Sequence, residues 1–554
     1  GTEKGYYVGA SNMYGHNPGD LEYRFQRVAP IHVSPHDPAL IYHASQYVHK
    51  TTDEGRTWQT ISPDLTANEA DKQVISGSPI TRDITGEEVY SAIYSLRESP
   101  LQSGVIWTGA NDGPVHITRD GGENWQDVTP RGLPRGGRVD AVEPSPHDDA
   151  KAYIAVLRYQ LGDSKPYIYK TENYGKNWQL LTTGSNGIPG DHPTRVVRED
   201  PKKEGLLYAG TEYGLFVSFD DGENWHSFQQ NLPVTPVTDI KVHRGDLAIS
   251  TMGRAFWVLD NITTLRQDAI SELADKTILF KPADTIRYRQ IHRSGETKTV
   301  PDYPAPAVVI DYYLPNGDNT DLKLEILDPN EQVIARYLGA DETADESKDN
   351  DEPIFRDMAT GEVSYLRVDS LTTAEGINRF RWNMKHLGPW HEDDEDRFKR
   401  GPLAAPGSYT ARLTSGNSVI EQPFELLMDP RVVEAGTSAS DVEQQLELEL
   451  KIVDLLSRAR KLEHQLATER EELENQQESE ALSQDDNMRL TLVTTALDQL
   501  KTADMIYPQP MLTDQISYLY YMISNADQLP GKAAEDRFQE LGEQFNRLLE
   551  AVGN

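Results

Sequence analysis

The chain has 554 residues, which is too long for one ordinary domain and predicts about two to four. Its formal net charge of −35 disfavours binding to nucleic acid or to anionic lipid, because their phosphates would be repelled. It has no cysteine, which excludes disulfides and cysteine nucleophiles, and no stretch approaches the roughly 20 apolar residues that cross a membrane.

A turn motif recurs four times within residues 51–225. It follows the pattern Ser/Thr-x-Asp/Asn-x-Gly-x-Asn/Thr-Trp. The acid or amide accepts hydrogen bonds from the amides of its own turn, and glycine adopts a backbone angle that other residues resist. We predict that these repeat turns are structural, with each Trp buried and its N–H near an acceptor. The acid or amide and the Trp of the copies are Asp53 and Trp58, Asp120 and Trp125, Asn173 and Trp178, and Asp220 and Trp225.

A second repeat runs in phase with these turns. A strand ends in a proline-containing turn and is followed by a short strand with an aromatic residue, at 33–42, 98–107, 144–153 and 199–208. Each unit therefore reads as four antiparallel strands, which is one blade of a β-propeller. The last unit, 238–260, has three strands and no repeat turn. Residues 1–265 are predicted to form about five blades.

Residues 1–24 do not resemble a complete first blade. Two arrangements stay open: a small closed ring, or the C-terminal part of a larger ring that another segment completes. In the second case we expect a protein partner, or the N-terminal part of the same precursor, to pack near 25–33 and 247–259.

The pattern of apolar residues changes after the blades. Residues 266–306 are predicted to be a connector, and 307–432 alternate like the strands of an immunoglobulin- or fibronectin-type β-sandwich. Two acidic inserts, 341–352 and 392–396, are expected to be solvated loops. They could hold calcium, although their acids lack a regular ligand spacing.

Residues 433–554 are predicted to form a helical bundle. Apolar residues recur at steps of three and four, as amphipathic helices require, and prolines separate the helices. The bundle could pack on its own chain or on a partner, including a second copy. The predicted stripe of the first helix is Leu448, Ile452, Leu455, Ala459, Leu462, Leu466 and Leu473.

The order of blades, sandwich and helices resembles large bacterial proteins described as sortilin-like or glycosyl-hydrolase-like BNR-repeat proteins. The segments that carry the resemblance are 30–66, 194–225 and 245–267, and the repeat turns are similar to the Asp boxes of sialidase-type propellers. The resemblance implies a bacterial, extracytoplasmic propeller with further repeats before the segment seen here. The link to peptide-binding sortilins rests on the propeller alone, and a fold does not define a function.

Candidate functional residues lie in the loops between the second and third strands of the blades, on the face opposite the repeat turns. A pair of carboxylates there could act as in glycosidases, and arginines could clamp an anionic group. The alternative is that these acids and arginines pair with one another or with the backbone. The candidates are Asp112 and Glu212 for catalysis, and Arg158, Tyr159, Tyr213 and Arg254 for ligand binding.

Motifs of known enzymes are missing from the sequence. It has no sialidase residue set, metalloprotease motif, serine-hydrolase elbow or phosphate loop, and its scattered histidines predict no metal or cofactor. Two functions remain: a binding or assembly protein for a protein, peptide or glycan, or a carbohydrate-active hydrolase or lyase. Paired acids on the loop face would favour the enzyme, and an aromatic or apolar face without them would favour binding.

Overall fold

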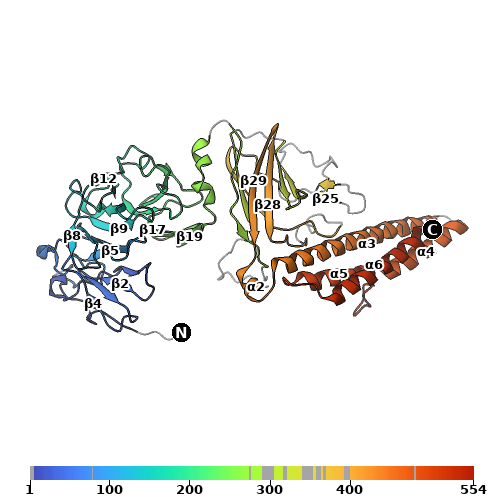
Figure 1. Ribbon diagram of the computed structural model, residues 1–554, viewed down its shortest axis with the longest axis horizontal. Helices are drawn as coiled ribbons and strands as arrows, with labels where there is room; N and C mark the ends of the chain where they lie inside the picture. Colours follow the sequence, from blue (N-terminus) through green and yellow to red (C-terminus); the bar gives the residue numbers. More distant parts are fainter. Residues whose placement is uncertain are drawn as a thin grey trace. The chain divides into compact units, whose positions relative to one another are not determined.

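The computed structural model describes residues 5–77, 79–273, 276–289, 305–315, 321–339, 354–356, 363–365, 370–391, 400–479 and 482–553. The chain divides into two compact units, Gly1–Arg266 and Gln267–Asn554 (Figure 1). The prediction of a mainly β chain with a helical C-terminal region is confirmed. The predicted acidic inserts, 341–352 and 392–396, and with them the possible calcium site, lie outside the described residues.

The first unit consists of antiparallel sheets whose strands pair in sequence order. Sheet 1 contains β1 (Ile31–Val33), β2 (Ile41–Ala44), β3 (Val48–Thr51) and β4 (Gln59–Thr60). Sheet 2 contains β5 (Ile93–Glu98), β6 (Ile106–Ala110), β7 (Val115–Thr118) and β8 (Trp125–Asp127). Sheet 3 contains β9 (Arg138–Pro144), β10 (Ala152–Leu157), β11 (Ile168–Thr171) and β12 (Gln179–Leu180). Sheet 4 contains β13 (Thr194–Glu199), β14 (Leu207–Thr211), β15 (Gly214–Ser218) and β16 (His226–Ser227). Sheet 5 contains β17 (Val237–His243), β18 (Asp246–Thr251) and β19 (Phe256–Leu259).

These sheets pack on one another in the order of the sequence, from blue to green in Figure 1. The first strand of each sheet lies against the first two strands of the sheet before it: β5 on β1 and β2, β9 on β5 and β6, β13 on β9 and β10, and β17 on β13 and β14. The arrangement is propeller-like. The 3₁₀ helices η1 (Pro18–Asp20), η2 (Ala70–Lys72), η3 (Tyr159–Leu161) and η4 (Thr263–Arg266) lie outside the sheets.

Small residues make this packing possible. The fourth residue of the second strand is Ala44, Gly109, Ala155 or Gly210 in sheets 1 to 4, and the fifth residue of β18, Ser250, takes this position in sheet 5. A Cβ atom on Gly109 would lie 2.3 Å from Val139 of β9, and one on Gly210 would lie 2.8 Å from Val237 of β17. The first strand of the next sheet therefore occupies the space that a larger side chain would need.

The repeat turns have the hydrogen bonds that their sequence predicts. In the second copy, Thr118 Oγ1 donates to Asp120 Oδ1 at 2.8 Å, and the side chain of Asn124 donates to Asp120 Oδ2 at 2.8 Å. Gly122, at φ +101°, closes the turn by donating its N–H to Thr118 Oγ1. The hydrogen bonds from Asn124 and Thr118 lower the pKa of Asp120 to about 2.

Three of the four repeat turns also reach the sheet before them. The indole N–H of Trp125 donates to the carbonyl of Ile61 at 2.9 Å, that of Trp178 to Val128 at 2.6 Å, and that of Trp225 to Leu181 at 3.2 Å. Trp225 is 3% exposed, as predicted. Trp58, Trp125 and Trp178 are only half-buried, in contrast to the prediction.

The second unit begins with η5 (Asp268–Glu272) and continues with two sheets around one shared apolar core. One sheet has the order β20 (Ile278–Leu279), β22 (Val308–Leu314), β27 (Gly376–Trp382). The other has the order β21 (Thr285–Ile286), β29 (Ser418–Leu427), β28 (Gly407–Ser415), β23 (Lys323–Leu327), β24 (Val333–Leu338). A separate hairpin pairs β25 (Ile354–Arg356) with β26 (Val363–Tyr365). Strands β20 and β21 thus lie within the predicted connector and belong to the two sheets.

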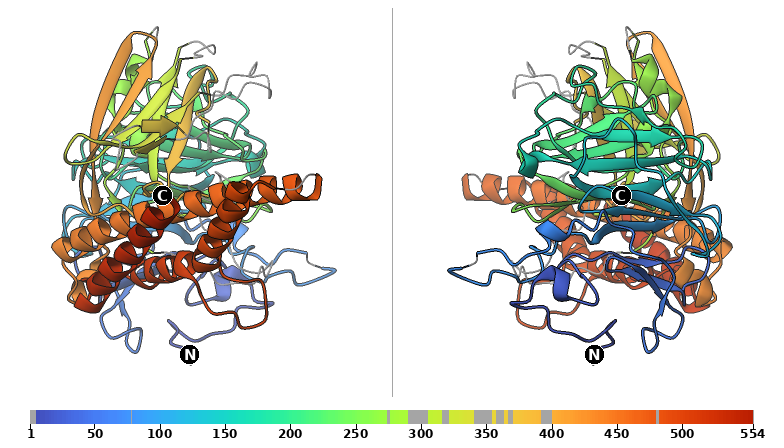
Figure 2. Two further views of the ribbon diagram at one scale, coloured as in Figure 1. Left: turned by 90° about the vertical axis from the view of Figure 1, so that its right-hand side faces the viewer. Right: turned by 90° about the vertical axis from the view of Figure 1, so that its left-hand side faces the viewer.

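The predicted C-terminal helices are α2 (Pro430–Glu434), α3 (Ala439–Ser479), α4 (Gln484–Leu500), α5 (Leu512–Ser524) and α6 (Lys532–Gly553). The long helix α3 runs beside α4, α5 and α6 (Figure 1, Figure 2). The predicted stripe of α3 is buried from Leu448 to Leu466, whereas Leu473 is half-exposed near the end of the helix.

A buried ionic cluster connects the strand residues to the helices. Arg287, which follows β21 and is fully buried, donates to both carboxylate oxygens of Asp527 between α5 and α6, at 3.0 and 3.1 Å. Arg289 donates to Asp527 at 2.8 Å and lies 3.9 Å from Glu449 of α3, which is 1% exposed. A buried charge without its partner is costly, so this cluster specifies how α3 and α5 pack on the sheets.

We predict that Trp225→Ala destabilises sheet 4 by about 3–5 kcal/mol, because it removes a buried indole and its bond to Leu181. Trp58→Ala is the matched control and should cost less, because the Trp58 indole N–H has no hydrogen-bond partner among the described residues. Hydrogen exchange in mild urea measures the loss of protection, at β14 and β15 for Trp225→Ala and at β2 and β3 for Trp58→Ala. Equal losses of protection for the two variants would contradict the prediction.

Glu449 should make the stability of the second unit depend on pH. Burial raises its pKa to about 7, against the attraction of Arg289 and a hydrogen bond from Gln445. Because the folded pKa lies above the ordinary value of 4.5, the stability that this carboxyl contributes is complete below about 4.5 and is lost as the pH rises through 7. Glu449→Gln should therefore reduce the fall in melting temperature between about pH 5 and pH 8. Glu443→Gln, at an exposed position on α3, should leave that fall unchanged.

Candidate functional site

The loops between second and third strands gather at one edge of the first unit, together with the links between sheets. Asn111 donates its N–H to the carbonyl of Ala92, Glu212 to that of Pro193, and Met252 to that of Pro236, at 2.9 to 3.0 Å. In each pair the second residue belongs to the link that enters the same sheet. We call this region, formed by loops 111–114, 158–167, 212–213 and 252–255 with their links, the loop edge.

Glu212 is part of a chain of ion pairs at the loop edge. Its carboxylate accepts from Arg195 Nε at 2.6 Å, and Arg195 lies 3.7 Å from Asp140, which Arg138 also contacts. The side chains of Arg195 and Asp140 are 5% and 6% exposed, and burial raises the pKa of Asp140 against the opposing effect of Arg138. The Glu212 carboxylate therefore links β13 to the loop between β14 and β15. This agrees with the alternative that the candidate acids pair with arginines.

Asp112 lies in different surroundings. It is 2% exposed, and its Oδ2 accepts from the N–H of Ala67 at 3.0 Å. Because Ala67 belongs to the link between sheets 1 and 2, this hydrogen bond attaches the link to the loop between β6 and β7. Within the described part of the chain its Oδ1 has no hydrogen-bond partner. Burial raises the pKa of the carboxyl, which is typical of a candidate proton donor, but its low exposure leaves little surface for contact with a substrate.

The arginines proposed as anion ligands differ from each other. Arg158 is 8% exposed, donates to Asp163 at 3.0 Å, and also donates to the carbonyls of Pro134 and Arg135 at 2.9 Å. Its guanidinium thus holds a neighbouring link in place. Arg254 is exposed, and its backbone carbonyl accepts from the indole N–H of Trp257.

Aromatic and aliphatic side chains are exposed along the loop edge. Tyr159 is 41% exposed at the start of η3, and Tyr213 is 49% exposed with its ring 4.6 Å from that of His192. Sequence reasoning identified both tyrosines but missed three exposed apolar residues in the loops and links of the same region. These are Leu161, Val234 and Met252, at 55%, 73% and 57% exposure. Their position in predicted loops between strands was the signal that could have identified them.

Two of the scattered histidines, His36 and His147, have structural contacts. His36 Nε2 is hydrogen-bonded to the carbonyl of Ser99, and His147 Nε2 to that of Asp200, both at 2.8 Å and both from one sheet to the next. The described residues contain no group of three or more acids or histidines that could hold a metal ion. None of the described helices is both long and apolar enough to cross a membrane.

No protein-family model matches the chain, and no curated protein sequence matches it either. A GH74 xyloglucanase from Xanthomonas campestris aligns at 17% identity and a TM-score of 0.32, over 42% of this chain and 36% of that chain. PorZ, a surface component of the type-IX secretion system of Porphyromonas gingivalis, aligns at 12% identity and a TM-score of 0.31, over 72% of this chain and 51% of PorZ. YCF48, solved with a bound D1 peptide, aligns at 12% identity and a TM-score of 0.23, over 40% of this chain and 76% of YCF48. The chain covers less than two thirds of the xyloglucanase and of PorZ, and its propeller-like arrangement rests on its own sheet topology.

We predict that neutralising the two candidate acids has opposite effects on the stability of the first unit. Glu212→Gln should destabilise the first unit by roughly 1–3 kcal/mol, because it leaves Arg195 without its closest charge partner. Asp112→Asn should be neutral or stabilising at about pH 8, because its raised pKa disfavours the charged form, and should lose that advantage near pH 4. Melting temperatures of both variants at the two pH values test this. A larger loss for Asp112→Asn at pH 8 would contradict the assignment.

Proposed function

We propose that this chain is an extracytoplasmic binding and assembly protein with five propeller blades, sheets 1–5, that a partner extends. An immunoglobulin-like sandwich and a helical bundle follow the blades. The observation that carries the proposal is the exposure of the two end faces of the stack of sheets. The extracytoplasmic location rests on the family resemblance.

The first end face belongs to sheet 1. Ile31 of β1 lies opposite the third residue of β2 and is 70% exposed. Its counterparts by register in sheets 2, 3 and 4 face the preceding sheet and are buried: Leu96, Val142 and Val197, at 4%, 1% and 0%. Tyr23 and Phe25 cover part of this face by contact with His49, but Ile31 stays exposed. The face lacks the preceding sheet that its counterparts have.

The second end face belongs to sheet 5. Phe256 of β19 lies opposite the small residue Ser250 and is 83% exposed, and Val258 beside it is 59% exposed. Apolar side chains occupy the same register in the other sheets, and there the following sheet buries them. They are Val48, Val115, Ile168 and Leu215, at 0%, 0%, 0% and 4% exposure.

The repeat turns agree with this interpretation. Three of the four tryptophans donate to a carbonyl of the preceding sheet, whereas the Trp58 indole N–H, in sheet 1, is buried and has no partner among the described residues. A buried donor without an acceptor is costly, and a preceding sheet would supply the missing carbonyl. The partner that fits both faces is therefore a polypeptide with sheets of the same repeat, from a second protein or from another part of the same precursor.

The loop edge is the proposed site for a further protein, peptide or glycan ligand. Tyr159 and Tyr213 offer exposed rings, and Arg254 offers an exposed guanidinium. Glu212, in contrast, is held by Arg195. Exposed aromatic rings suit the binding of a ligand, and an acid held in an ion pair is not available for hydrolysis. The loop edge therefore favours binding over hydrolysis.

A carbohydrate-active hydrolase or lyase is the second candidate. It is favoured by Asp112 alone, since this buried carboxyl has a raised pKa and an oxygen without a partner within the described ranges. Glycoside hydrolysis requires a second carboxyl group flanking the same bond. Glu212 would have to leave Arg195 to serve in this role.

We predict that the isolated chain self-associates through its end faces as its concentration rises, because exposed apolar sheet faces seek cover. Light scattering after size-exclusion chromatography measures the mass. Ile31→Asp and Phe256→Asp should each reduce association, and Val419→Asp, at a 60% exposed position of β29 in the other unit, should not. A compact monomer whose first and last sheets protect each other from hydrogen exchange would show a self-closed ring and overturn the proposal.

A further inference from the structure

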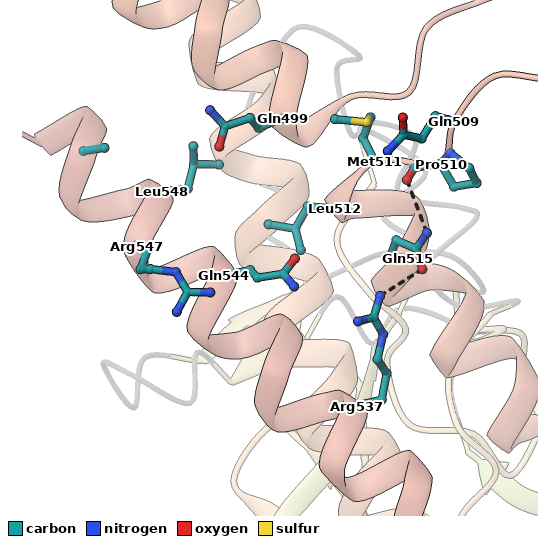
Figure 3. A pocket seen from close by; sticks show the side chains of 11 residues that line it. Gln499, Gln509, Pro510, Met511, Leu512, Gln515, Arg537, Gln544, Arg547 and Leu548 are labelled. Atoms are coloured by element: carbon teal, nitrogen blue, oxygen red, sulfur yellow. Dashed lines mark hydrogen bonds between the residues drawn. The ribbon is translucent and has the colours of Figure 1, made fainter.

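A groove of about 550 Å³ opens among α4, α5, α6 and the segment before α5 (Figure 3). Its floor is apolar, with the buried side chains of Leu512 and Leu548. Glutamine amides and two arginines surround this floor, and Figure 3 shows Gln515 between Pro510 and Arg537. The lining residues are Gln499, Gln509, Pro510, Met511, Leu512, Gln515, Arg537, Gln544, Arg547, Leu548 and Ala551.

The charge of this groove is opposite to that of the chain. No acid lines it, although the chain has 89 acidic against 54 basic residues. Arg537 contacts Glu540 at 2.6 Å, and Arg547 lies 3.7 Å from Glu543. Both glutamates are more than half exposed, and exposed pairs of this kind are weak. An incoming carboxylate can therefore replace them at little cost.

The polar lining suits a peptide backbone. Each glutamine amide can both donate and accept a hydrogen bond, as an extended chain requires. Gln515 is held in place by Arg537, which donates to its Oε1 at 3.1 Å. A neighbouring hollow of about 560 Å³ shares Pro510 and Gln515 with the groove. It is also lined by Asp514, Ser517 and two exposed tyrosines, so the carboxylates of a ligand belong at the arginines of the groove and an apolar side chain at this hollow. The tyrosines are Tyr518 and Tyr521, at 67% and 64% exposure.

We propose that this groove binds an extended acidic peptide segment of a partner protein. Carboxylates of the segment pair with Arg537 and Arg547, its backbone lies against the glutamines, and an apolar side chain covers Tyr518 and Tyr521. Because two arginines and no acid line the groove, charge complementarity favours an anionic ligand. Nucleic acid fits less well, because the groove has two cations and no lysine, and the net charge of −35 repels a phosphate chain. This site is independent of the end faces of the first unit.

Fluorescence anisotropy tests the proposal with the full chain and a rhodamine-labelled peptide of alternating Leu and Glu, six residues long, at low salt. The peptide should bind, and Arg537→Gln with Arg547→Gln should weaken binding by roughly tenfold or more, because each removes a charge-assisted contact. Lys532→Gln, a matched loss of charge on α6 outside the groove, should change binding by less than about twofold.

Tyr518→Ser with Tyr521→Ser changes only exposed side chains and should also weaken binding, so the proposal stays testable if the arginine variants lose helicity. Binding of the alternating Leu and Lys peptide with equal affinity would overturn it. Absence of binding, or equal loss in Lys532→Gln, would do the same. Displacement of the peptide by an equal concentration of a single-stranded oligothymidylate would assign the groove to nucleic acid instead.

Discussion

The first unit depends on one steric constraint: each sheet must receive the first strand of the next sheet on its own second strand. Ala44, Gly109, Ala155 and Gly210 leave the space for that strand, and apolar residues on both sides fill the remainder. A twisted antiparallel sheet of four short strands cannot bury both of its faces alone. Stability therefore comes from the contacts between sheets, and it is shared along the stack.

The same constraint explains the polar contacts between sheets. Carbonyl groups of a neighbouring sheet bond to three of the four repeat-turn tryptophans and to His36 and His147. Tyr42 and Tyr153 reach a glutamate of the next sheet in the same way. These bonds recur at equivalent positions, so their absence at an end of the stack is visible as an unpaired donor or an exposed apolar side chain.

The second unit is held together by different interactions. Its two sheets share an apolar core, while a buried ionic cluster around Asp527 determines how the helices pack on them. Arg287 and Arg289 both donate to this carboxylate, and a shift of α5 by one turn would leave the buried charges of Arg287 and Asp527 without their partners. The helices in turn leave a groove on α6 that has basic groups in an otherwise acidic chain. The two units thus offer surfaces of different chemistry, one apolar and one polar.

The sequence by itself determined the elements that depend on local rules. Hydrogen bonding within six residues defines each repeat turn, and the helical stripe from Leu448 to Leu466 follows from the period of one helix. Sequence alone did not show that Glu212 pairs with Arg195, that Asp112 is buried, or that three of the four tryptophans are half-exposed. Those properties arise between residues of different sheets, so only tertiary structure decided them. The same reason explains why Ile31 and Phe256 read as ordinary core residues in the sequence: their exposure depends on a neighbouring sheet that local patterning cannot reveal.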